Sequence, residues 1–158
     1  MVIRLGWVGN HIRKILHIWV EQRDRGACHL AKHSRGFGAV GVIGVGTIGG
    51  AGTIRDIEVD PDNWKVVYAA DAADVFRTND VTAAHPVWTK ITGNLQAIGQ
   101  TGLRSLEYIE AGTGDMLLVS GIGGVSRLRN PDTAPTIDQW VRLGSGLPNV
   151  VVFDVEFI

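Results

Sequence analysis

A cysteine and several histidines near the start of the chain are the first residues that could do chemistry. His29 and His33 are four residues apart, Cys28 directly precedes the first of them, and His11 and His17 lie upstream. Thiolate and imidazole groups bind transition metals, but a metal site needs three or four ligands that converge. The spacing to the upstream histidines matches no known metal-binding pattern. We therefore expect solvated or partly packed histidines and no metal.

Glutamates recur at a fixed interval in the rest of the chain. Glu58, Glu107 and Glu156 follow one another at intervals of 49 residues. They could form a ring of acids that binds a cation in a central channel, or occupy a polar position on strands whose other face is packed. Repetition favours the second interpretation, because chemistry usually needs one special constellation. Since no spacing among the acids singles out a catalytic pair, we assign no catalytic residues.

A glycine pattern of the dinucleotide-binding type, G-x-G-x-x-G, occupies residues 44–49 after an apolar run at 40–43. This pattern holds a pyrophosphate only when its last glycine opens a helix. Gly50 and Gly52 follow at once and a strand is expected from Ile54, which leaves no room for that helix. We therefore expect a glycine-rich hairpin and no nucleotide cofactor.

The elements that must position these residues come from an internal repeat. The hexapeptide IRDIEV starts at Ile54, LRSLEY starts at Leu103 and VFDVEF starts at Val152, again at intervals of 49 residues. The similarity continues inside each unit, where Trp88 and Trp140 lie 52 residues apart. A change from 49 to 52 is typical of short loop insertions. Units of about 40–50 residues are typical of the blades of β-propellers.

Each unit contains four short runs of apolar and β-branched residues separated by Gly, Asp, Asn or Pro. In the first unit the runs lie at about 54–59, 65–70, 74–78 and 87–91. Such residues suit a pleated, half-buried surface, and the residues between them suit turns. We predict an all-β fold, namely a partial β-propeller of about two four-stranded antiparallel blades. The blades span 52–101 and 102–151, and a third starts at 152.

The segment 53–158 resembles the Asp-box, or bacterial neuraminidase repeat, β-propellers, which include sialidases, sortilin-type receptors and xyloglucan-degrading glycosidases. The box of this family reads Ser/Thr-x-Asp-x-Gly-x-Thr-Trp and lies between the third and fourth strands of a blade. Its counterparts here are Asp80 with Trp88 and Asp132 with Trp140, eight residues apart in each unit. In the family the two residues are five apart, and the internal glycine of the box is missing from both copies here.

The resemblance implies structural roles for these four residues, because the box aspartate ties down its own hairpin and the tryptophan packs between sheets. A sialidase site would also need an arginine triad and a tyrosine nucleophile beside an acid. The two tyrosines, Tyr68 and Tyr108, each lie inside a predicted strand. The resemblance therefore favours a non-catalytic recognition or scaffold module of a secreted type that contacts protein or glycan. The alternative is a fragment of a sialidase- or xyloglucanase-like glycoside hydrolase.

Charge divides the chain into two parts. The 158 residues carry a net charge of −1, which argues against a nucleic-acid partner, and the single cysteine excludes an internal disulfide. Residues 1–51 hold seven Lys/Arg and two Asp/Glu, a net charge of +5, whereas residues 52–158 hold eight and fourteen, a net charge of −6. We treat 1–51 as a separate basic, Gly- and His-rich segment.

The structure of this basic segment is open at the sequence level. Apolar residues at 12, 15, 16, 19 and 20 fit one face of a helix capped by Asn10, and a strand over 15–20 fits as well. Residues 37–54 carry no charge, but seven of these 18 residues are glycine, so we expect no membrane span. No secretory signal is visible at the N-terminus.

Ring closure sets the last expectation. Propellers close with about four to eight blades, whereas this chain provides about two. Open blade faces would leave apolar surface in water. We therefore expect the chain to pack against remaining propeller blades or to self-associate.

Overall fold

The computed structural model describes residues 2–4, 16–23, 27–34, 43–111, 114–133, 140–144 and 150–157. All regular secondary structure assigned within these residues is β-strand, and the strands form three four-stranded sheets. The first sheet consists of β1 (Val2–Arg4), β2 (Leu16–Arg23), β3 (Ala27–Ser34) and β4 (Ile43–Thr47). The second consists of β5 (Asp56–Val59), β6 (Val67–Ala70), β7 (Val75–Thr78) and β8 (Trp88–Lys90). The third consists of β9 (Leu106–Ile109), β10 (Met116–Gly121), β11 (Gly124–Arg129) and β12 (Val141–Arg142).

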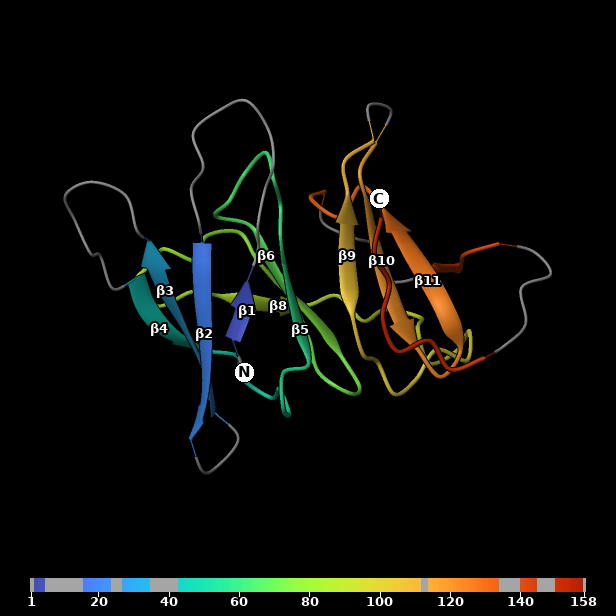
Figure 1. Ribbon diagram of the computed structural model, residues 1–158, viewed down its shortest axis with the longest axis horizontal. Coiled ribbons are helices and arrows are strands. Elements are labelled where there is room, and N and C mark those ends of the chain that lie inside the picture. Colours follow the sequence, from blue (N-terminus) through green and yellow to red (C-terminus); the bar gives the residue numbers. More distant parts are fainter. Residues whose placement is uncertain are drawn as a thin grey trace.

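Each sheet is an antiparallel meander, in which every strand pairs with the next one along the chain. The three sheets lie in a row, with β5–β8 between β1–β4 and β9–β12 (Figure 1). The predicted all-β fold is therefore confirmed, and so are the two four-stranded antiparallel sheets in the part of the chain from β5 to β12. The arrangement is propeller-like but not closed.

The basic N-terminal segment contributes strands. Leu16–Val20 lie in β2, which pairs with β3 without interruption from Leu16 opposite Ser34 to Arg23 opposite Ala27. The helical interpretation is therefore wrong for Leu16–Val20, and the strand interpretation is correct there. Tryptophan and β-branched residues suit a sheet once a partner strand is available. Residues 10–15 lie outside the described residues.

Two apolar clusters cover the two faces of the second sheet. Successive side chains of a strand point to opposite faces, so the alternate residues of β6 enter different clusters. Tyr68 and Ala70 pack toward the third sheet, which adds the buried side chains of Leu106, Leu117, Val119, Leu128 and Trp140. Val67 and Ala69 belong to the other cluster, together with Ile48, Ala51 and Ile54 from the segment before β5. Burial on both faces makes every residue of β6 a core residue.

The β10–β11 hairpin turns through glycines and yields a first prediction. Gly121 pairs with Gly124, which has a φ of 93°. A Cβ on Gly121 would lie 2.6 Å from the main-chain oxygen of Thr101, which accepts a hydrogen bond from the amide of Ile122. We expect Gly121→Ala to lower the free energy of unfolding by about 1–3 kcal/mol in urea denaturation. Gly49→Ala is the control, since its Cβ would meet nothing within 4 Å. Equal stability of the two variants would contradict this close approach.

Candidate functional site

Polar side chains gather between the second and third sheets. Tyr68 lies on β6 and Tyr108 on β9, and their ring centroids are 5.7 Å apart with an interplanar angle of 34°. Tyr68 is fully buried and Tyr108 is partly buried. Asp115 precedes β10, and Asp132 lies in the turn after β11. We call these four residues the tyrosine–aspartate cluster.

Asp132 joins both tyrosines. The Tyr68 hydroxyl donates a hydrogen bond to Asp132 Oδ1 at 2.6 Å. The Tyr108 hydroxyl lies 3.0 Å from Asp132 Oδ2 and 3.1 Å from Asp115 Oδ2. In addition, Arg77 Nη2 on β7 donates to the main-chain oxygen of Asp132 at 2.8 Å. The turn after β11 of the third sheet is thereby bonded to two strands of the second sheet.

The environment of the cluster keeps both phenols protonated. Burial raises the pKa of Tyr68 and of Tyr108 above the ordinary value, and the hydrogen bond and the charge of Asp132 raise each pKa further. A nucleophilic side chain needs an accessible and activated oxygen. Tyr68 has no exposed surface, and its hydroxyl acts as a hydrogen-bond donor. The geometry suits the joining of sheets and does not suit nucleophilic attack.

Asp80, which follows β7 as Asp132 follows β11, makes local contacts. Its Oδ1 accepts hydrogen bonds from the main-chain amide of Thr82 at 2.9 Å and from the Thr82 hydroxyl. These bonds lower the pKa of Asp80 below its ordinary value. Asp80 thus holds the turn after β7. Asp132 follows the equivalent strand but directs its carboxylate to the two tyrosines.

Trp88 and Trp140 lie at corresponding positions of their sheets, at β8 and directly before β12. Trp88 is opposite Thr78 in the β7–β8 pair. In the β11–β12 pair Val141 is opposite Arg127, so continuing this register by one residue places Trp140 opposite Leu128. Trp140 is 1% exposed, and its Nε1 donates to the main-chain oxygen of Ile91 at 2.8 Å. Trp88 is partly exposed, and its Nε1 has no hydrogen-bond partner among the described residues. The two positions therefore match in register and differ in packing.

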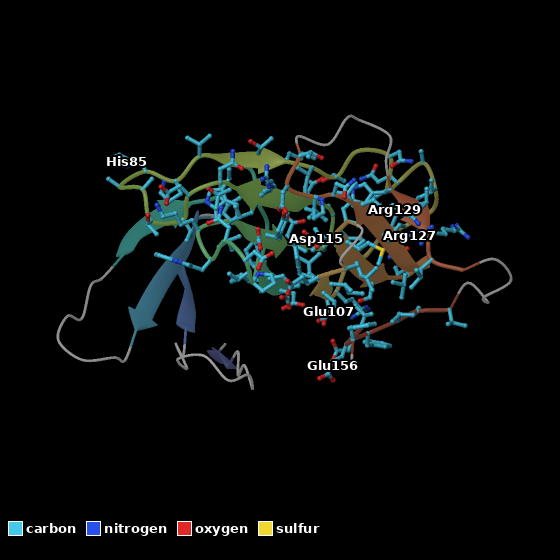
Figure 2. The ribbon with its side chains drawn as sticks, turned by 90° about the horizontal axis from the view of Figure 1, so that it is seen from above. His85, Glu107, Asp115, Arg127, Arg129 and Glu156 are labelled. Carbon is cyan, nitrogen blue, oxygen red and sulfur yellow. The ribbon has the colours of Figure 1, made fainter. Side chains whose placement is uncertain are left out.

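Carboxylates gather along the first strands of the units and the C-terminal segment. We call Asp56, Glu58, Glu107, Asp154 and Glu156 the carboxylate row. Burial raises the pKa of Glu58 to about 8, and the charges of Glu107 and Asp56 add to the effect. Burial also raises the pKa of Glu107, to which the charges of Glu156, Asp56 and Asp154 contribute. Figure 2 shows Glu107 and Glu156 on the same side of the molecule. The fold thus brings the repeated glutamates near one another.

Glu58 yields a prediction on pH dependence. Its pKa is about 8 in the folded chain against an ordinary value of 4.5. Between these values the folded chain retains a proton that the unfolded chain has released, so the free energy of unfolding falls as the pH rises, by at most about 1.4 kcal/mol per pH unit. Glu58→Gln cannot ionise and should lack this decline. Urea denaturation from about pH 5 to pH 8 measures both proteins. Equal slopes would assign the decline to another group.

A contact that we did not predict joins successive units. Asp56 Oδ2 accepts a hydrogen bond from the main-chain amide of Leu106 at 2.8 Å, and Ser105 Oγ accepts one from the amide of Val155 at 3.0 Å. Asp56 and Ser105 are the third residues of the hexapeptides, and Asp154 holds the same place in the last one. A short hydrogen-bond acceptor in all three copies was the available signal. We call this contact the repeat hydrogen bond.

His17, His29, His33 and Cys28 lie on the first sheet. His17 is on β2, opposite His33 on β3, and β3 also carries Cys28 and His29. His11 lies outside the described residues. In the described part of the chain, no group of three or more His, Cys, Asp or Glu residues could hold a metal ion.

The glycine pattern at 44–49 lies in a strand and a turn. Gly44 and Gly46 belong to β4, which pairs with β3, and Gly49 lies in the turn that follows. Where a pyrophosphate site requires a helix, a turn at Gly49 and Gly50 and irregular backbone lead instead to β5 at Asp56. Within the described ranges, the chain contains no helix of the length and apolarity that a membrane crossing requires.

Comparisons with known proteins were made at the level of family, sequence and structure. No family model matches the chain, and searches of curated proteins and of solved structures find no match either.

Proposed function

We propose that this chain is a non-catalytic recognition or scaffold module that contacts protein or glycan. The observation that supports this proposal is the use made of the tyrosine–aspartate cluster. Both phenols are protonated, and Tyr68 is fully buried and donates to Asp132 across two sheets. Residues that could have served catalysis are thereby engaged in holding the fold together.

We further propose that the sheets are propeller blades of the Asp-box type. Asp80 and Asp132 follow equivalent strands, and each precedes its tryptophan by eight residues. Trp88 and Trp140 occupy matching ladder positions. The same resemblance supports a secreted or extracellular location and a glycan or protein ligand.

The test of the proposal is a screen of the intact chain against glycans. Immobilised sialosides and xyloglucan fragments serve as binding probes, and the release of reducing sugar reports hydrolysis. We expect retention of a ligand without turnover. Release of sugar above the rate of a heat-denatured sample would contradict the non-catalytic assignment.

The carboxylate row supports a second candidate function, a glycoside hydrolase. Such enzymes pair a protonated carboxyl group with an ionised one. With a pKa of about 8, Glu58 is protonated at neutral pH and lies within the electrostatic influence of Glu107. If the screen detects hydrolysis, Glu58→Gln should abolish it, whereas Tyr68→Phe should leave the chemical step intact. This pair of variants separates an acid–base site from a tyrosine site.

A further inference from the structure

The repeat hydrogen bond defines how one unit receives the next. In the second sheet, Asp56 Oδ1 accepts a hydrogen bond from the amide of Ile57 at 2.9 Å, while Oδ2 accepts one from Leu106 in the following unit. The carboxylate is thus oriented by its own strand and offers its other oxygen to the neighbour. Ser105 Oγ likewise accepts a hydrogen bond from the amide of Val155 in the following hexapeptide.

Asp154 is oriented by the amide that follows it, as Asp56 is, but no described residue of a further unit donates to its other oxygen. Its Oδ1 accepts a hydrogen bond from the amide of Val155 at 3.0 Å, as Asp56 Oδ1 does from Ile57. No described residue donates a hydrogen bond to Asp154 Oδ2, and the side chain is exposed. Among the described residues, the position that corresponds to the acceptor of the next unit is therefore oriented and has no donor.

The segment around Asp154 also exposes apolar side chains. Phe153 is 68% exposed and Phe157 is 65% exposed. The Arg104 guanidinium lies 4.2 Å from the centroid of the Phe153 ring. A segment that combines exposed aromatic rings with an oriented acceptor has the composition of an interface core.

The opposite end of the row of sheets has the complementary charge. The strands β1–β4 contain Arg4, Arg23 and Lys32 against Glu21, a net charge of +2, whereas residues 150–157 contain Asp154 and Glu156, a net charge of −2. In Figure 1 the β1–β4 sheet lies at one end of the row, and the C-terminal segment runs beside β9 and β10 of the sheet at the other end. Two copies placed head to tail would therefore bring a basic sheet against an acidic, aromatic segment. Opposite charges on the two faces favour this encounter over a symmetric one.

We propose that a second copy of this chain binds at residues 150–157 through its β1–β4 sheet. A main-chain amide of the incoming β1, the counterpart of β5 and β9, donates to Asp154 Oδ2 and continues the repeat hydrogen bond. Phe153 and Phe157 become buried against the incoming sheet. This inference rests on the blade-type repeat in the proposed function and is independent of the ligand. Head-to-tail contacts of this kind produce closed rings or open fibres.

Sedimentation of the full chain over a concentration series tests the proposal. We expect multiples of the 17.0 kDa chain to form as concentration rises. Higher salt should weaken this association, because it screens the charges of the two ends. Asp154→Lys should weaken association by about tenfold or more. Asp62→Lys is the matched control, since it changes the charge equally at the exposed turn between β5 and β6 and should associate as the unmodified chain does.

Phe157→Ser is a second variant at the same surface and should also weaken association. The side chains of Asp154 and Phe157 are both exposed, so each variant should still fold as a monomer, which circular dichroism would verify. A monodisperse 17.0 kDa species at every concentration would overturn the proposal. Equal association of Asp154→Lys and Asp62→Lys would overturn it as well. Sedimentation is independent of glycan binding and hydrolysis, so failure here and failure of the proposed function are distinguishable.

Discussion

Trp140→Ala is expected to lower the free energy of unfolding by about 3–5 kcal/mol. The Trp140 ring is 1% exposed and belongs to the apolar cluster between the second and third sheets. Its removal leaves a cavity between two sheets and deprives the main-chain oxygen of Ile91 of its indole donor. Domains have a net stability of only about 5–15 kcal/mol, so the loss is a large part of the total. Equilibrium denaturation in urea measures it.

Trp88→Ala provides the matched control at the equivalent ladder position. The Trp88 ring is partly exposed, and its Nε1 has no hydrogen-bond partner among the described residues. Its loss removes less buried area and no described hydrogen bond, so we expect a smaller change in unfolding free energy. A loss as large as that of Trp140→Ala would show that the two rings are packed alike.

Asp132→Ala is expected to cost about 1–3 kcal/mol, because it leaves the buried phenol of Tyr68 without an acceptor. Tyr68 loses its described acceptor, whereas Tyr108 retains Asp115. The effect should appear as a lower urea midpoint together with looser association of the second and third sheets. Asp80→Ala is the control, since the bonds of Asp80 lie within its own turn.

A double-mutant cycle isolates the bond between the two sheets. Tyr68→Phe removes the hydroxyl that would be stranded by Asp132→Ala. The double variant should therefore be less destabilised than the sum of the single variants. Strict additivity would mean that the two groups contribute independently and that Asp132 does not join the sheets through Tyr68.

The sequence allowed the second and third sheets to be predicted but not the first. Those two sheets repeat one hexapeptide, and residues 54–59 and 103–108 align without a gap. The segment 15–20 has apolar residues that fit both a helix and a strand, because a short run does not separate the two periods. Pairing of β2 with β3 decides between them. That partner is a tertiary contact, which local periodicity does not contain.

The sequence predicted several residues of the candidate site but not the contacts that they make. The box spacing identified Asp132, but its partner Tyr68 is 64 residues away and meets it only because two sheets pack face to face. The repeated glutamates were identified as a series, whereas the raised pKa of Glu58 depends on how deeply the strand is buried. The Asp56 and Ser105 contacts were missed because a repeat in sequence does not state which atoms face the next unit.

The shared apolar cluster has a consequence for how the chain opens. Tyr68 and Ala70 on β6 and Leu117 and Val119 on β10 belong to the same cluster, so neither sheet can separate without wetting the inner face of the other. Local opening in proteins follows contiguous cooperative units. The boundary between the sequence repeats thus falls inside one cooperative unit. Amides of β6 and β10 should exchange with solvent together, with a protection that corresponds to the free energy of global unfolding.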